Sequence, residues 1–157
     1  MDIDTRCEHL SESRWANEFT GPELFALAKY MSFTTVDRGQ PILREGDREA
    51  YLCVLIRGRA AVVKESATGG KPETLATIGE GSVLGEMSLF DGEPRSATVI
   101  ASEDADLLVF TAHHLETLTH DKPLLAAKLL LKLGKVISQR LRVASGKLCE
   151  VSHLIKG

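Results

Sequence analysis

Residues 78–99 read IGEGSVLGEMSLFDGEPRSATV, and this segment is the most informative part of the sequence for the fold. Its pattern predicts the end of a strand, a turn opened by Gly85, one short helical turn at 86–90 and a loop closed by Pro94. A new strand is expected from Ser96, where apolar residues resume. The segment therefore joins two strands through a tight loop that a glycine opens.

The polar residues of this loop suit the binding of an anion. Gly85 allows a ligand to approach the backbone closely, and the amides of the helical turn after it are free to bind negative charge. Arg95 lies at the far lip of the loop, where its planar guanidinium can bind a phosphate through two hydrogen bonds, and Ser96 adds a hydroxyl donor. Glu86 is an acceptor beside this anion site, which makes sense if the phosphate belongs to a sugar whose hydroxyl must be held. Each feature alone fits a β-turn with a surface salt bridge, but the ordered combination predicts a ligand site.

Short strands surround this loop. From residue 34 to residue 111, segments rich in Val, Ile, Leu and Thr alternate with glycine-bearing turns. Turns spaced by about ten residues predict an all-β sandwich or barrel. We expect a central strand, apolar on both faces, at 51–56, a return strand at 60–64, and further strands at 74–78, 97–101 and 106–110. The fold class that follows is mostly β with flanking helices.

Helical signals flank the β region on both sides. Thr20 is the expected N-cap of a helix whose apolar residues recur at helical spacing. Thr111 is expected to cap a short helix that runs to residue 118. Asp121 is expected to cap a long helix with Pro123 in its first turn.

The long C-terminal helix carries apolar residues at alternating spacings of four and three, the pattern of a coiled-coil seam. The seam comprises Leu130, Gly134, Ile137, Leu141, Ala144, Leu148, Val151 and Ile155. A helix that runs past Val143 outreaches a domain of this size, so we expect a homodimer through this helix. The alternative is that the helix ends at Gly146 and the tail folds back, because glycine weakens a helix.

Composition excludes several classes of function. The 157-residue chain has a net charge of −3, which argues against a nucleic-acid-binding surface. Cys7, Cys53 and Cys149 are far apart and form no CxxC pair, which argues against zinc ribbons, iron–sulfur clusters and a disulfide framework. We expect free thiols in a reducing compartment. The N-terminus has no apolar signal core, and lysines interrupt the longest apolar stretch, 124–133, so a cytoplasmic protein with no membrane partner is expected.

The chain resembles the cyclic nucleotide-binding domain family, which includes bacterial catabolite activator proteins, regulatory subunits of cyclic-AMP-dependent kinase and nucleotide-gated channels. The family's phosphate-binding cassette is similar to Leu84-Gly85-Glu86-Met87-Ser88-Leu89 followed by Arg95-Ser96-Ala97-Thr98-Val99. Similar segments also occur at 42–47, 55–58 and 78–81. The resemblance covers residues 20 to about 145 and implies a β-roll or jelly-roll barrel, also described as a double-stranded β-helix, followed by a long C-terminal helix.

The resemblance also implies roles for the cassette residues. Glu86 would accept a hydrogen bond from the ribose 2′-hydroxyl, and Arg95 would pair with the exocyclic oxygens of the cyclic phosphate. The remaining residues would complete the site, with Ser96 and the amides near Met87, Ser88 and Ala97 at the phosphate, Gly85 allowing the close approach, and Leu84 and Met87 on the apolar wall.

On the long helix, Arg140 is the candidate for the residue that caps the base, with Gln139, Ser138 and Ser145 as alternatives. The expected ligand is cyclic AMP, with cyclic GMP as the alternative. The expected division of the chain is an N-terminal extension at 1–19, a β-roll domain at 20–121 and a lid or dimerisation helix at 122–157.

The expected function is that of a sensor domain, which signals to an unknown protein partner by a conformational change of its C-terminal helix. Family transcription factors carry a winged helix after that helix, and the sequence given ends at Gly157, so we expect no direct DNA binding. We expect no catalytic residue, metal site or cofactor, since no HExxH, GxSxG or P-loop sequence occurs. The alternatives are a ligand-free dimerisation module with the same fold, or a haem or redox sensor, although such sensors usually lose the Glu and Arg of the cassette.

Overall fold

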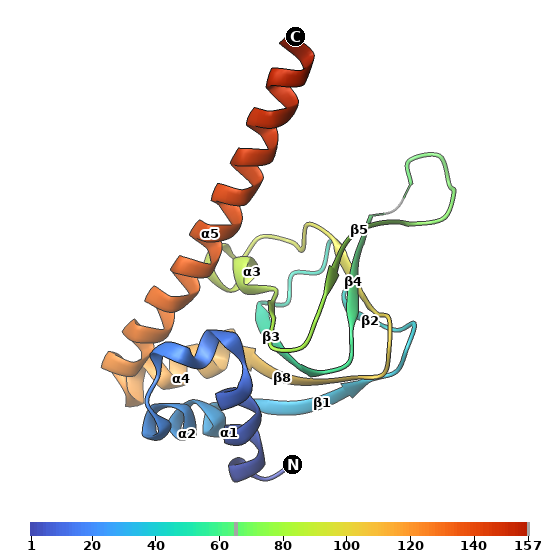
Figure 1. The fold of residues 1–157 in the computed structure, drawn as a ribbon. Coiled ribbons are helices and arrows are strands. Elements are labelled where there is room, and N and C mark those ends of the chain that lie inside the picture. Colours follow the sequence, from blue (N-terminus) through green and yellow to red (C-terminus); the bar gives the residue numbers. More distant parts are fainter. Residues whose placement is uncertain (65, 157) are drawn as a thin grey trace.

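Two antiparallel sheets of four strands form the body of the molecule (Figure 1). The computed structural model describes residues 1–64 and 66–156, and it describes the backbone alone at 15, 151 and 153–156. In sheet order, the first sheet contains β1 (Ser32–Val36), β8 (Ala105–Thr111), β3 (Tyr51–Arg57) and β6 (Val83–Leu84). The second contains β2 (Pro41–Leu43), β7 (Thr98–Ala101), β4 (Ala60–Lys64) and β5 (Glu73–Ile78).

The five expected strands are all present, and the predicted jelly-roll fold is confirmed, although the described sheets do not close into a barrel. The return strand β4 lies at the expected residues, and it crosses from the central strand to the other sheet, where it pairs with β5 and β7. The turn at Gly58 makes this crossing possible. Gly58 has a φ of 94°, and a Cβ there would overlap the backbone carbonyl of Asp104. Only glycine fits such a turn without strain.

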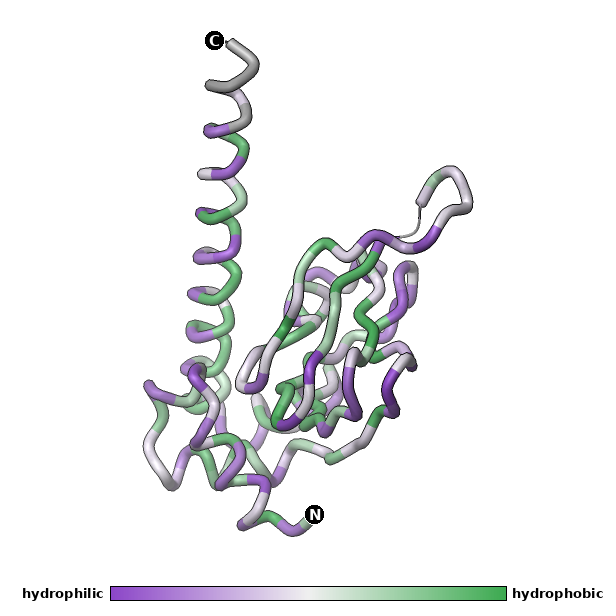
Figure 2. The backbone as a smooth tube through the Cα atoms, turned by 45° about the vertical axis from the view of Figure 1, so that its right-hand side comes forward, coloured by the Kyte–Doolittle hydropathy of each residue, from purple (hydrophilic) through white to green (hydrophobic). Residues whose placement is uncertain are grey.

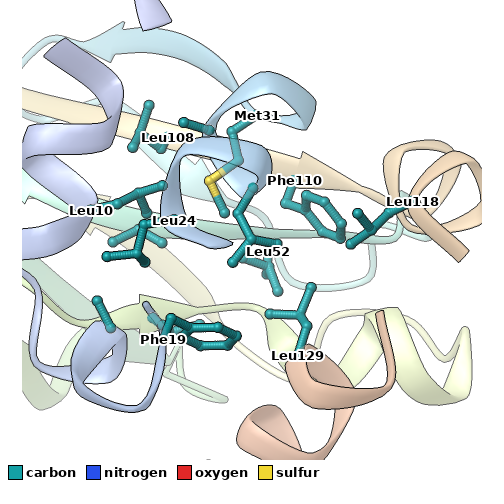
Figure 3. Close-up of a cluster of buried hydrophobic side chains, with 14 of the residues drawn as sticks. Leu10, Phe19, Leu24, Met31, Leu52, Leu108, Phe110, Leu118 and Leu129 are labelled. Carbon is teal, nitrogen blue, oxygen red and sulfur yellow. The ribbon is translucent and has the colours of Figure 1, made fainter. Parts of the chain in front are cut away.

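The first sheet is buried on both of its faces, which explains why its central strand is apolar throughout. Alternate residues of β3 point to different apolar clusters, with Leu52 and Val54 in one and Cys53 and Leu55 in the other. The first cluster lies between this sheet and the helices, where Leu10, Leu24, Leu118 and Leu129 surround Leu52, Leu108 and Phe110 (Figure 3). The second cluster fills the space between the two sheets, next to the loop at 85–97.

Six helices are present in the described residues: α1 (Ile3–Glu12), the 3₁₀ helix η1 (Arg14–Glu18), α2 (Gly21–Tyr30), α3 (Glu86–Asp91), α4 (Ala112–Asp121) and α5 (Pro123–Lys156). Two predicted caps are confirmed. Thr20 accepts a hydrogen bond from the Glu23 amide at 3.3 Å, and Thr111 accepts one from the His114 amide at 3.1 Å. The segment 1–19 contributes Leu10 to the main core, while the division into domains stays a prediction.

The prediction that Asp121 caps the long helix is wrong. Asp121 is the last residue of α4, and its carboxylate accepts a hydrogen bond from the Tyr30 hydroxyl at 3.0 Å. Only Lys122 separates α4 from α5, so the chain has no room for a separate capping turn.

The long helix α5 has two halves with different surroundings. Its first half packs into the main core through Leu125, Ala126, Leu129 and Leu133. Ion pairs also hold this half, since Lys128 contacts Glu23 at 2.8 Å and Lys135 contacts Glu18 at 3.1 Å.

Its second half extends away from the body (Figures 1 and 2) and carries exposed Leu141 and Leu148. The helix continues through Gly146, so the alternative of a helix end there is wrong. The side chains of Val151 and Ile155 from the expected seam lie outside the described ones. Among the described helices, none is both long and apolar enough to cross a membrane.

Candidate functional site

A cavity of about 510 Å³ lies between the second sheet, α3 and α5. The cassette residues and Arg140 all line it: Leu84, Gly85, Glu86, Met87, Ser88, Arg95, Ser96, Ala97 and Arg140. The alternatives to Arg140 on the long helix, Gln139, Ser138 and Ser145, do not line this cavity. The apolar wall opposite comes from residues that the sequence did not single out, namely Leu43, Val62, Ala76, Ile78 and Val99. The period of two in β5, which puts Ala76 and Ile78 on one face, was the available signal.

Gly85 begins the short helix α3 in a left-handed conformation, with a φ of 76°. A Cβ at this position would overlap the Arg95 guanidinium and lie 2.9 Å from the carbonyl oxygen of Tyr51. The Ser88 hydroxyl donates a hydrogen bond to the Gly85 carbonyl at 3.2 Å. Gly85 therefore permits a close approach, as its residue type indicates, and in this structure the group that approaches it is the side chain of Arg95.

Arg95 is a buried cation held mainly by backbone groups. It is 6% exposed, and its two terminal nitrogens donate hydrogen bonds to the carbonyl oxygens of Gly85 at 2.7 Å and Tyr51 at 2.6 Å. A guanidinium has five N–H donors, so these bonds leave three for another partner. Among the described residues, Arg95 forms no salt bridge. A buried charge without a countercharge is costly, so this wall of the cavity favours an anion.

Glu86 is a buried carboxylate, and only one of its two oxygens has a partner among the described residues. Its Oε1 forms an ion pair with the Arg140 guanidinium, which reaches it from α5. Its Oε2 is buried and has no hydrogen-bond partner among the described residues. Because Glu86 is only 2% exposed, the unpartnered oxygen is strongly unfavourable unless a donor is supplied. A hydroxyl group of a ligand is such a donor.

Arg140 extends from α5 to the rim of the cavity and contacts two groups there. One guanidinium nitrogen contacts Glu86, and the other donates a hydrogen bond to the carbonyl of Val83 at 2.7 Å. The side chain is 50% exposed, so it lies at the mouth of the cavity and not at its floor. Arg140 therefore connects α5 directly to the loop that the sequence identified, and this connection could not be predicted from local sequence.

The other cassette residues differ in exposure. Leu84 is buried within the cluster between the sheets, whereas Met87 is 57% exposed at the rim of the cavity. Ser96 is exposed and Ala97 is half-buried, so both are open to a ligand that enters from solvent. The structure brings these residues together, and their roles in binding stay predictions.

No cysteine or histidine of the described part of the chain lines this cavity. Among the described residues, no group of three His, Cys, Asp or Glu side chains could hold a metal ion. His114 accepts a hydrogen bond from the Thr111 amide at 3.2 Å as part of a helix cap, and burial lowers its pKa. Cys53 is buried between the sheets, and burial raises the pKa of its thiol to about 12.

The thiols are therefore expected to differ strongly in reactivity. At pH 8, Cys149 should react quickly with iodoacetamide because it is exposed, whereas Cys53 should stay unmodified in the folded chain. A pKa of about 12 leaves about one Cys53 thiol in ten thousand ionised at that pH. Peptide mass spectrometry during alkylation measures the three rates, and rapid modification of Cys53 in the folded chain would contradict this assignment.

Comparisons with known proteins identify the family. The family model described as cyclic nucleotide-binding domain matches residues 33–122, which is more than half of the chain. The chain belongs to the cyclic nucleotide-binding domain family, as the resemblance of its cassette indicated. It is 34% identical to a cyclic AMP receptor protein of Thermus thermophilus over 124 residues, which cover 78% of this chain and 55% of the relative. The chain thus spans about half the length of that relative.

Solved structures show the same fold. A cyclic nucleotide-binding domain from Methylobacillus flagellatus superposes with a TM-score of 0.78 at 30% identity, covering 92% of this chain and 81% of the other. The catabolite activator protein of Thermus thermophilus has a TM-score of 0.76 at 30% identity, covering 89% of this chain and 63% of the other.

Proposed function

We propose that this chain is a sensor domain that binds cyclic AMP in the cavity and performs no chemistry on it. The observation that carries the proposal is the pair of unsatisfied charged groups on one cavity wall, the Arg95 cation and the Oε2 atom of Glu86. A ligand that satisfies both must combine an anion with a hydroxyl donor. A free phosphate would place negative charge beside the carboxylate, and a nucleoside would leave the cation unpaired.

A cyclic nucleotide supplies both groups from one rigid unit. The three free N–H donors of Arg95 and the Ser96 hydroxyl would bind the exocyclic phosphate oxygens, and Glu86 Oε2 would accept from the ribose 2′-hydroxyl. The apolar wall formed by Val62, Ala76 and its neighbours would take the base. The volume of about 510 Å³ lies within the usual range for small-molecule sites.

Binding would be coupled to the long helix through Glu86. Its two oxygens would then serve two partners, Arg140 of α5 on Oε1 and the ligand on Oε2. A ligand hydroxyl that donates to Oε2 changes the negative charge of the Glu86 carboxylate that Arg140 contacts. The ligand therefore shifts the preferred position of α5. Couplings of this kind are typically about 1–3 kcal/mol. The signal would pass from α5 to a protein partner, while the cytoplasmic location and the lack of DNA binding stay predictions.

Calorimetric titration of the nucleotide-stripped chain with cyclic AMP, cyclic GMP and 5′-AMP tests the proposal. We expect micromolar or tighter binding of cyclic AMP and weaker binding of the other two, in line with the relative that is named a cyclic AMP receptor protein. Tighter binding of cyclic GMP would keep the sensor function and change the ligand. Binding of none of them would favour the ligand-free dimerisation module.

We also propose that a second copy of the chain packs on α5. A shallow groove on this helix is lined by Ala127, Leu130, Leu131, Gly134, Lys135, Ser138, Gln139 and Arg142. Leu131 is 70% exposed and Leu141 is 65% exposed, so an apolar stripe continues along the helix beyond the body. Small residues such as Gly134 let two helices approach closely, which supports a helix-to-helix contact.

Leu141→Glu is expected to shift the chain from dimer to monomer. The substitution puts a charge into the proposed interface, but Leu141 is exposed in the single chain, so the thermal midpoint of the monomer should change little. Sedimentation equilibrium measures the change, with Cys149→Glu as the control because Cys149 is exposed on α5 outside the seam. A wild-type chain that sediments as a monomer at high micromolar concentration would contradict the proposed dimer.

A further inference from the structure

Tyr51 contacts Arg95 with two different groups. Its carbonyl oxygen accepts a hydrogen bond from the guanidinium at 2.6 Å, and its ring centre lies 4.6 Å from the guanidinium carbon. An arginine over an aromatic ring at this distance forms a cation–π contact. One residue at the start of β3 therefore holds the buried cation both at its edge and on its face.

The ring of Tyr51 is itself fixed in place. Its hydroxyl donates a hydrogen bond to the carbonyl of Ile42 at 3.1 Å, and Ile42 belongs to β2 in the other sheet. The ring thus connects the two sheets directly behind the cavity. Tyr51 is not among the residues that line the cavity, so it acts on a ligand only through Arg95.

These contacts leave the guanidinium few alternative orientations. The ring lies against one face of the group, with its centre 4.6 Å from the guanidinium carbon, and the carbonyls of Gly85 and Tyr51 each hold one terminal nitrogen. The direction of the three remaining N–H donors is then fixed before any ligand arrives. Ordering a free arginine side chain costs conformational entropy, so an arginine that is already ordered binds an anion more tightly.

We infer that Tyr51 is a positioning residue, whose ring orients Arg95 for the phosphate of the ligand. The inference rests on the proposed function, since it gives Tyr51 a role in binding and not only in packing. If the ring were only a spacer between the sheets, an apolar side chain that is not aromatic, such as leucine, would replace it without loss of affinity.

Three variants separate these roles. Tyr51→Leu removes the ring and keeps the backbone carbonyl, and it should weaken cyclic AMP binding by about 2- to 30-fold, the range of a cation–π contact. Tyr51→Phe keeps the ring and loses only the bond to Ile42, so its affinity should stay within about threefold of the wild type. In an Arg95→Gln background, which has no cation, Tyr51→Leu should cause no further loss. Calorimetric titration measures all of these affinities.

A second measurement detects the contact between the Tyr51 ring and the Arg95 guanidinium in the absence of a ligand. In the free chain, the ring of Tyr51 should shift the NMR resonances of the Arg95 side chain, and this shift should persist in Tyr51→Phe and disappear in Tyr51→Leu. Wild-type affinity in Tyr51→Leu, or an equal loss in the Arg95→Gln background, would overturn the positioning role while the proposed function stands. A folded wild-type chain that binds no cyclic nucleotide would overturn both.

Discussion

Replacement of Arg95 by alanine is expected to weaken cyclic AMP binding by about 10- to 150-fold, because it removes a charge-assisted contact worth about 1.5–3 kcal/mol. The same change should lower the free energy of unfolding by about 1–3 kcal/mol, since it leaves the carbonyls of Gly85 and Tyr51 without their donor. Calorimetric titration and urea unfolding measure the two effects separately.

Two further variants control this experiment. Arg95→Lys keeps the charge and loses the planar fork, so its affinity should lie between those of the wild type and Arg95→Ala. Arg59→Ala removes an arginine that is 71% exposed and does not line the cavity, and it should change neither affinity nor stability measurably. Unchanged cyclic AMP affinity in Arg95→Ala would show that Arg95 is not the phosphate-binding residue.

Substitution of Glu86 by glutamine should also weaken cyclic AMP binding, by about tenfold or more, because the 2′-hydroxyl then meets a neutral acceptor in place of a carboxylate. The ligand offers a matched probe for this contact. The wild type should bind 2′-deoxy cyclic AMP about tenfold or more weakly than cyclic AMP, while Glu86→Gln should show a smaller difference between the two, because a neutral acceptor forms a weaker hydrogen bond. Calorimetric titration of both proteins with both ligands measures the four affinities that this comparison needs.

Glu93→Gln is the control for the Glu86→Gln comparison, because Glu93 also lines the cavity but is exposed. This variant should bind cyclic AMP more tightly than 2′-deoxy cyclic AMP by the same factor as the wild type. Equal binding of the two nucleotides by the wild type would show that the hydroxyl does not reach Glu86.

Local signals in the sequence were sufficient to predict many of the elements. The caps at Thr20 and Thr111 depend on residues three positions away, and the strands depend on alternation within a few residues. The sheet that β4 joins could not be predicted, because it depends on a turn, here at Gly58, and on contacts with the distant Asp104. Asp121 has the right residue type for a cap, but the preceding helix extends through it.

In the candidate site too, residues close together in the sequence could be predicted as a group, whereas contacts between distant residues could not. The loop from Gly85 to Ser96 is continuous in sequence, so its glycine, carboxylate and arginine could be predicted together. Tyr51 and Arg140 lie 44 and 54 positions from the groups that they contact, and no local pattern relates them to the loop. The apolar wall likewise depends on which face of the second sheet points inward.

A crystal structure of the chain grown with cyclic AMP would test the proposed binding site most directly. We expect the nucleotide in the cavity, with its phosphate oxygens on Arg95 and Ser96 and its 2′-hydroxyl donating to the Oε2 atom of Glu86. A nucleotide bound outside the cavity, or one inside it whose phosphate lies away from Arg95, would show that the proposed site is wrong.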